Sequence, residues 1–95
     1  MTFTQRLHPG IRAGEITCSV RIWQRPRVKV GGRYAFEDGA IVVDSLRRID
    51  LSEVTPALAK RSGFAGVVDL LKVAKHGRGE QVYLVGFHFE PGKRR

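Results

Sequence analysis

Apolar and polar residues alternate along several short segments of the chain. Between Thr17 and Ile22, polar Thr, Ser and Arg residues alternate with apolar Cys, Val and Ile residues. A period of two is typical of a strand with one polar face. Three further segments, 33–37, 40–51 and 81–89, have the composition of strands. Because 81–89 is apolar on both faces, we expect it to lie in the middle of the sheet.

Glycine and proline mark the connections between these strands. The pair Asp38-Gly39 predicts a tight hairpin between the segments 33–37 and 40–51. Pro26 cannot donate a hydrogen bond to a neighbouring strand, so residues 24–30 are expected to form a loop or an irregular edge.

Helical patterns occur at the beginning and in the second half of the chain. Residues 3–13 predict a short helical entry that Pro9 and Gly10 interrupt. Thr55 and Pro56 are typical of a helix start and Gly63 of its end. A second helix is predicted over 64–76, with Gly77 after its end. Its apolar face is expected to contain Phe64, Val67, Val68, Leu71 and Ala74.

Together these elements predict an α+β fold in which helices pack against a curled sheet. The length of 95 residues and the lack of low-complexity sequence predict one domain over 1–95, with 91–95 as a flexible basic tail. No segment approaches the roughly 20 apolar residues that cross a bilayer, and the N-terminus lacks the apolar run of a signal peptide. The single Cys18 cannot form an internal disulfide. We therefore expect a cytoplasmic protein in which Cys18 is a small buried residue.

The charge is the first indication of function. The chain has 17 Lys and Arg residues against 9 Asp and Glu residues, a net charge of +8 to which the last three residues contribute only three. Such a charge favours a polyanionic partner, and nucleic acid rather than a membrane because no basic amphipathic helix is evident. The alternative is a basic surface that only keeps the protein in solution.

Several stretches, in their order and spacing, resemble the ASCH-domain family, the prokaryotic branch of the PUA-like β-barrels. They are Ile11–Gly14, Lys29–Gly31, Ala59–Phe64, Asp69–Leu71 and Val82–Phe87. The resemblance covers nearly the whole chain. It implies a small PUA-like mixed β-barrel of about five or six strands with two or three short helices.

The family signature, G-x-K-x-x-[ET]-x-R, falls on Gly14, Ile16, Ser19 and Arg21. Gly14 and Arg21 match it, Ser19 is a conservative variant of threonine, and Ile16 replaces the lysine. In members that resemble bacterial acetylcytidine amidohydrolases, this lysine, the threonine and a glutamate would carry the hydrolysis, and the glutamate position falls on Ser62. Isoleucine can neither accept a proton nor stabilise an oxyanion. The residues therefore argue against an amidohydrolase, and we assign no catalytic residue.

The candidate site is the polar face of the first strand together with the loop that follows it. Ser19 and Arg21 lie two residues apart, so a hydroxyl and a guanidinium can converge on one ligand. The alternative for Arg21 is an ion pair with Glu37 or Asp44. Trp23 either stacks on an unpaired base or belongs to the core. The candidate nucleic-acid-binding residues are Ser19, Arg21, Trp23, Arg25, Arg27, Lys29 and Arg33.

Our leading hypothesis is an RNA-binding module that takes single-stranded RNA, or a flipped or modified nucleotide, in a cleft lined by Ser19 and Arg21. Residues 25–33 would follow the phosphates. One alternative is a ribonuclease or a hydrolase of modified nucleosides that uses Ser19, Arg21, Lys29 and either Tyr34 or His88. Another is a regulatory protein-interaction module, which is supported only by the basic surface.

The remaining sequence patterns predict no metal site and no cofactor. His8, His76 and His88 are scattered, and no pair has the spacing of metal ligands. The chain contains neither a glycine-rich phosphate loop with lysine nor a nucleophile elbow.

Overall fold

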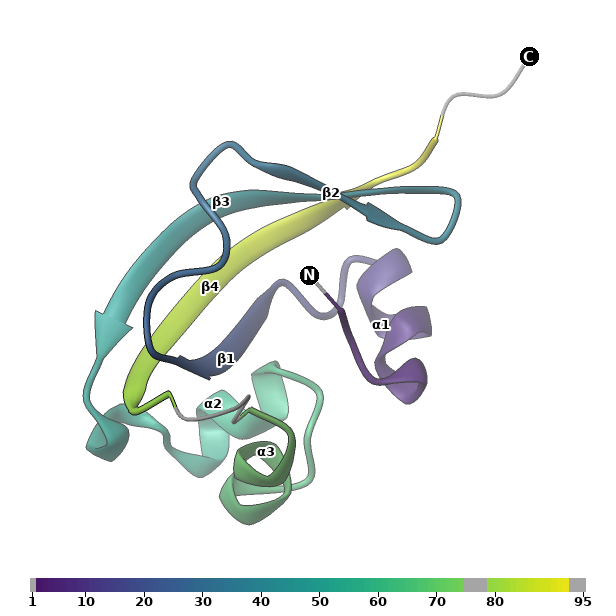
Figure 1. Cartoon of the computed structure of the whole chain (residues 1–95). Coiled ribbons are helices and arrows are strands. Elements are labelled where there is room, and N and C mark those ends of the chain that lie inside the picture. The colour runs from purple at the N-terminus through teal and green to yellow at the C-terminus, as the bar shows by residue number, and fades with distance from the viewer. Residues whose placement is uncertain (1, 75–78, 93–95) are drawn as a thin grey trace.

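The structure, a computed structural model that describes residues 2–74 and 79–92, is built around a strongly curved antiparallel sheet (Figure 1). Its strands are β1 (Cys18–Trp23), β2 (Arg33–Phe36), β3 (Gly39–Ile49) and β4 (Gln81–Glu90). The order β1-β4-β3-β2 puts β4 inside the sheet, as its two apolar faces predicted, and β1 at one edge. The described residues thus form a four-stranded half-barrel, with fewer strands than the five or six that the family resemblance implied.

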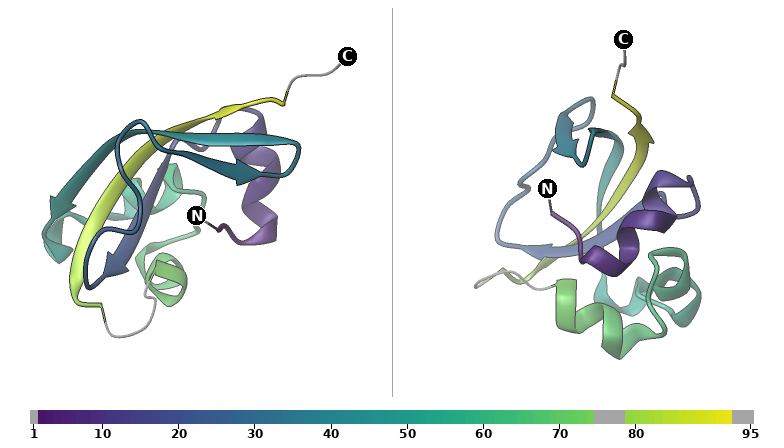
Figure 2. Two further views of the ribbon diagram at one scale, coloured as in Figure 1. Left: turned by 45° about the horizontal axis from the view of Figure 1, so that its top comes forward. Right: turned by 90° about the vertical axis from the view of Figure 1, so that its right-hand side faces the viewer.

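Short helices cover one side and one end of this sheet. Within the described residues they are α1 (His8–Arg12), which follows the 3-10 turn η1 (Gln5–Leu7), α2 (Pro56–Arg61), which follows η2 (Leu51–Glu53), and α3 (Val67–Ala74). Figure 2 shows α2 and α3 side by side beneath the sheet, with α1 apart from them. None of the described helices is long and apolar enough to cross a membrane.

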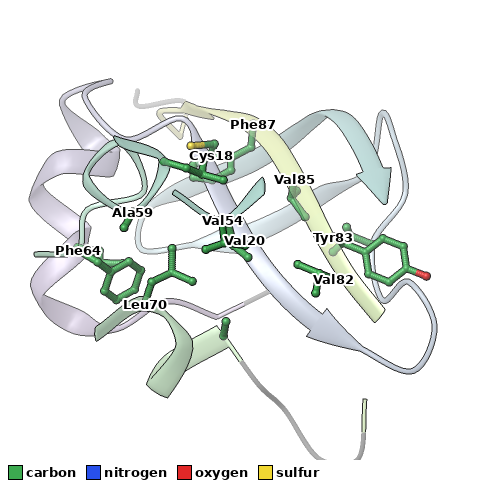
Figure 3. Packing of buried hydrophobic residues seen from close by; sticks show 14 of the residues in the cluster. Cys18, Val20, Val54, Ala59, Phe64, Leu70, Val82, Tyr83, Val85 and Phe87 are labelled. Atoms are coloured by element: carbon green, nitrogen blue, oxygen red, sulfur yellow. The ribbon is translucent and has the colours of Figure 1, made fainter. Parts of the chain in front are cut away.

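The edge strand β1 is buried on both of its faces. On one face, Val20 points toward Leu70 and Val54 between the sheet and the helices (Figure 3), and the Cys18 sulfur lies 3.5 Å from the Ser62 hydroxyl. Cys18 is therefore the small buried residue that the sequence predicted. On the other face, the Trp23 ring packs 5.8 Å from the ring of Tyr83, which lies on β4 opposite Arg21. Because both faces are covered, the polar strand face expected from the alternation is not solvated.

The second helix predicted from the sequence is shorter than expected and faces another way. Phe64 is buried, but it lies in the connection before α3, directly after Gly63 with its φ of +94°. The helix starts at Val67, and Leu70 is fully buried whereas Val68 is 69% exposed. The prediction that Val68 belongs to the apolar face was wrong. The last turn expected at 75–76 lies outside the described residues, as does most of the predicted tail at 91–95.

The hairpin between β2 and β3 forms one residue earlier than the Asp38-Gly39 pair suggested. Phe36 pairs with Gly39, so the turn residues are Glu37 and Asp38, and Glu37 takes a φ of +53°. Gly39 is required for a different reason, because a side chain there would approach the Glu90 carbonyl oxygen of β4 to 2.2 Å. A glycine that permits close strand packing was thus mistaken for a turn residue.

Candidate nucleic-acid interface

Arg21 is the most unusual side chain of β1, because it is a cation that is only 8% exposed. Its Nε donates a hydrogen bond to Ser19 Oγ at 2.8 Å, and its Nη2 donates one to the Thr2 carbonyl oxygen at 2.6 Å. The guanidinium also lies over the Phe3 ring, with 4.9 Å between Cζ and the ring centroid. Ser19 and Arg21 therefore lie together and bond to each other, and the N-terminal segment holds the guanidinium from its other side.

No carboxylate in the described part of the chain pairs with Arg21. The two acids proposed as partners are occupied elsewhere, since Glu37 bonds to His8 and Arg12 while Asp44 bonds to His88. Burial lowers the pKa of Arg21 to about 10, so the side chain remains charged at neutral pH. A buried charge without a counterion is costly and calls for a physical explanation.

A pocket of about 280 Å³ adjoins Arg21. Ser19, Val20 and Arg21 form one side of it, and the rest consists of Thr2, Thr4 and apolar residues that include Phe3 and Phe64. Neither a carboxylate nor an imidazole is among the described residues that line it, so the lining supplies cationic and hydroxyl donors but no general base. Such a pocket favours an uncharged or anionic group with a flat apolar part.

The basic loop that follows β1, residues 24–32, runs from one edge of the sheet to the other (Figures 1 and 2). Val28 is buried and anchors the middle of the loop, whereas Arg25, Arg27 and Lys29 are exposed. None of these three has an ion-pair partner among the described residues. They do not line the pocket, so the loop can contact only parts of a ligand that extend beyond it.

Two of the residues predicted to contact nucleic acid are poorly placed for such a contact. Arg33 lies on β2 and forms an ion pair with Glu90, so its charge is already compensated. Trp23 is 3% exposed and packs against Tyr83. Of the two alternatives for Trp23, the structure shows the core residue, and its ring is not available to stack on a base.

Of the two positions at which the sequence departs from the amidohydrolase pattern, Ser62 lies in the core and Ile16 is partly buried against it. Ser62 is buried, and its hydroxyl donates to the Leu58 carbonyl oxygen at 2.9 Å. Ile16 packs against the backbone of Gly10 and Gly63, where a side chain on either glycine would come within 2.8 Å of it. Neither residue lines the pocket beside Arg21. Both departures therefore serve packing in this chain.

The residues named for a hydrolase are also separated from the pocket. His88 lies on the exposed part of β4, where Nδ1 is 2.9 Å from Asp44 and Nε2 is 3.2 Å from Glu90. The hydrogen bond with Asp44, and then that with Glu90, raises the pKa of His88. The Tyr34 hydroxyl accepts a hydrogen bond from the Lys29 backbone N–H at 3.0 Å. Among residues 2–74 and 79–92, no group of three or more His, Cys, Asp or Glu side chains is arranged to hold a metal ion.

Comparisons with known proteins add no identification. No family model, curated protein or solved structure matches the chain. The interpretation of the site therefore depends on its own geometry.

Two residues of the site, Thr2 and Phe3, were missed by the sequence analysis. They complete the surroundings of Arg21 through a backbone carbonyl and a ring face. The single apolar residue between two threonines was the only signal for Phe3, and a backbone carbonyl leaves no signal in a sequence.

Proposed function

We propose that this protein binds RNA, with one unpaired nucleotide in the pocket beside Arg21. The observation that carries this proposal is the buried guanidinium that no carboxylate of the described chain neutralises. An acceptor group on a ligand would complete its hydrogen bonds in a site from which water is largely excluded. The apolar walls, with Phe3 and Phe64, suit the flat face of a base.

The size of the pocket fits this assignment. At about 280 Å³ it lies near the lower limit of ordinary ligand sites, which begin at about 300 Å³. It can take one base but not a stack of bases. A base inside a duplex cannot reach such a pocket, so the preferred substrate is single-stranded RNA or a nucleotide flipped out of a helix.

The basic loop supplies the second part of the proposed interface. Arg25, Arg27 and Lys29 are exposed and uncompensated, which is the state that phosphate contacts require. We place the curled half-barrel among the PUA-like domains resembling the ASCH family, as a binding module without the hydrolytic residues. The packing of Ile16 and Ser62 supports this placement, because neither can act on a ligand in the pocket.

The proposal is tested by the affinity of the purified protein for fluorescently labelled single-stranded RNA over a range of salt concentrations. If the three loop cations each contact one phosphate, log affinity will fall with log salt at a slope of about −2. A duplex of the same sequence should bind more weakly because its bases are paired. Changing Arg25, Arg27 and Lys29 to Gln should bring the slope close to zero.

A variant with equal charge removal at another place provides the control. Arg47, Lys60 and Arg61 are exposed residues of β3 and α2, and changing all three to Gln lowers the net charge by the same amount. This control should keep the slope of the wild-type protein. Equal losses in the two triple variants would show that only net charge matters, and the absence of RNA binding at low salt would overturn the proposal.

A further inference from the structure

The pocket beside Arg21 contains two buried hydrogen-bond donors that have no acceptor in the described part of the chain. Arg21 uses Nε and Nη2 for its bonds to Ser19 and to the Thr2 carbonyl oxygen, so Nη1 is left without a partner there. Ser19 Oγ accepts from Arg21, and its own proton is bonded to no described group, although Ser19 is only 9% exposed. Because buried polar groups are nearly always paired in native proteins, two open donors in one pocket indicate a ligand.

These two donors lie next to each other. The bond of 2.8 Å between Nε and Oγ holds the Arg21 guanidinium over Ser19, on one face of β1. The Phe3 ring lies against the guanidinium, with its centroid 4.9 Å from Cζ, and so fixes its plane. A single ligand group with several acceptor oxygens can therefore reach both Nη1 and the Ser19 hydroxyl.

The chemistry of the pocket favours an anion that only accepts hydrogen bonds. Both open groups are donors, and one of them carries a charge that no described carboxylate compensates. A neutral carbonyl would accept a hydrogen bond but would leave the buried charge uncompensated, which is costly. The Thr4 hydroxyl, on another part of the pocket lining, makes no capping bond to η1. It can thus act as a further donor to the same ligand.

We propose that the pocket binds the terminal phosphate group of an RNA strand, on Ser19 and Arg21. This inference rests on the proposed RNA binding and names the part of the RNA that enters the pocket. A phosphate monoester has three acceptor oxygens and a charge of about −1.5 to −2 at neutral pH. Its oxygens form strong, short hydrogen bonds with a guanidinium. The apolar walls remain available for the attached nucleoside.

A phosphate group inside the strand fits the pocket less well. An internal phosphodiester carries a single negative charge, so it compensates a buried guanidinium less strongly than a monoester does. The strand that enters with it must also leave, which would bring the nucleotides on both sides into the pocket. With a volume of about 280 Å³, the pocket has room for one nucleotide. The end of a strand meets this limit.

The test compares the affinities of internally labelled single strands that share one base sequence. One has hydroxyl groups at both ends, one a 5′-phosphate, one a 3′-phosphate, and the last has hydroxyl ends and one additional nucleotide. The longer strand adds a phosphodiester and so controls for added charge. We expect a phosphorylated strand to bind at least about tenfold more tightly than both hydroxyl-ended strands, the effect of one charge-assisted hydrogen bond. The end that gives this gain is the end that the pocket accepts.

Two variants test whether the gain arises in the pocket. Arg21→Met should abolish the preference for a phosphorylated end, and Ser19→Ala should reduce it, because each removes a donor. Both variants should retain the salt dependence that the basic loop provides. Arg61→Met, which removes an exposed charge outside the pocket, is the control and should keep the preference. The comparison of strand ends on the wild-type protein stands even where a variant fails to fold.

The outcomes separate this inference from the one on which it rests. Equal, salt-dependent binding of all the strands would overturn the binding of a terminal phosphate and leave RNA binding in place. The same conclusion follows if the longer strand gains as much affinity as the phosphorylated strands, or if the preference persists in folded Arg21→Met. Failure of every strand to bind would overturn both proposals.

Discussion

Replacing Arg21 by methionine should separate the stability of this protein from its binding. Methionine has a similar length and fills irregular apolar space, but it has no charge and no donor. The variant therefore keeps most of the packing around Phe3 and removes the guanidinium from the pocket. If Arg21 is held in place for a ligand, the fold should tolerate its loss.

The expected change in stability follows from two opposing effects. Burial lowers the pKa of Arg21 to about 10, which corresponds to about 3 kcal/mol by which the folded protein disfavours the charged form. The substitution relieves this cost. It also removes hydrogen bonds to Ser19 and Thr2, each worth about 1 to 2 kcal/mol for a charged donor, and a ring contact worth about 1 kcal/mol. We therefore expect the free energy of unfolding to fall by no more than about 2 kcal/mol.

The free energy of unfolding and the RNA affinity can both be measured on the same samples. Urea unfolding can be followed by the fluorescence of Trp23, the only tryptophan, because its ring is buried against Tyr83 in the folded protein. RNA affinity should fall at least about tenfold, the effect of one lost charge-assisted hydrogen bond. Arg61→Met, on the exposed side of α2 and outside both the pocket and the basic loop, is the matched control and should keep the affinity of the wild-type protein.

Two results would refute this reasoning. A loss of about 3 kcal/mol or more in unfolding free energy would identify Arg21 as a structural residue whose hydrogen bonds outweigh its burial. Unchanged RNA affinity in a fully folded variant would remove Arg21 from the binding site.

Two further predictions concern the scaffold. Gly63→Ala should lower the free energy of unfolding by about 1 to 2 kcal/mol, because φ is +94° there. Gly66→Ala, where a side chain would meet nothing within 4 Å, should be neutral in the same urea titration, and equal effects would contradict the argument. His88 has a raised pKa in the folded state. The stability that protonated His88 contributes to the folded protein is therefore complete below its ordinary pKa and is lost as pH rises through the folded value. The melting temperature of the wild type relative to His88→Gln should therefore fall as the pH rises above the ordinary pKa of 6.5 and through the folded value, and parallel curves would disprove the linkage.

The strands were predictable because their signals are local. The alternation around Val20 and the two apolar faces of β4 depend on the residues of each strand alone, and both segments form strands with the expected bounds to within about one residue. The turn was misplaced because the signal at Gly39 arises from contact with Glu90, which is distant in sequence. Val68 was placed on the wrong face because Phe64 was counted as part of the helix, whereas the helix starts at Val67 and buries the face that contains Leu70 and Ala74.

The candidate site was predictable only in part, for the same reason. The spacing of Ser19 and Arg21 correctly brought a hydroxyl and a guanidinium together. Which acids remain available to Arg21 is a tertiary property, since Glu37 and Asp44 are taken by histidines from other elements. The bond from Arg21 to Thr2 uses a backbone carbonyl, which any sequence would supply.

The residues that precede η1 hold the Arg21 cation in place. Thr2 and Phe3 together satisfy one donor of Arg21 and cover its guanidinium, although this short stretch belongs to no helix or strand. An affinity tag fused ahead of it would sit next to the pocket and alter access to it. Tags for binding studies therefore belong at the opposite terminus. Trimming the first three residues would open the cation to water and would also uncover Phe36 and Phe87 of the sheet, whose rings pack against Phe3.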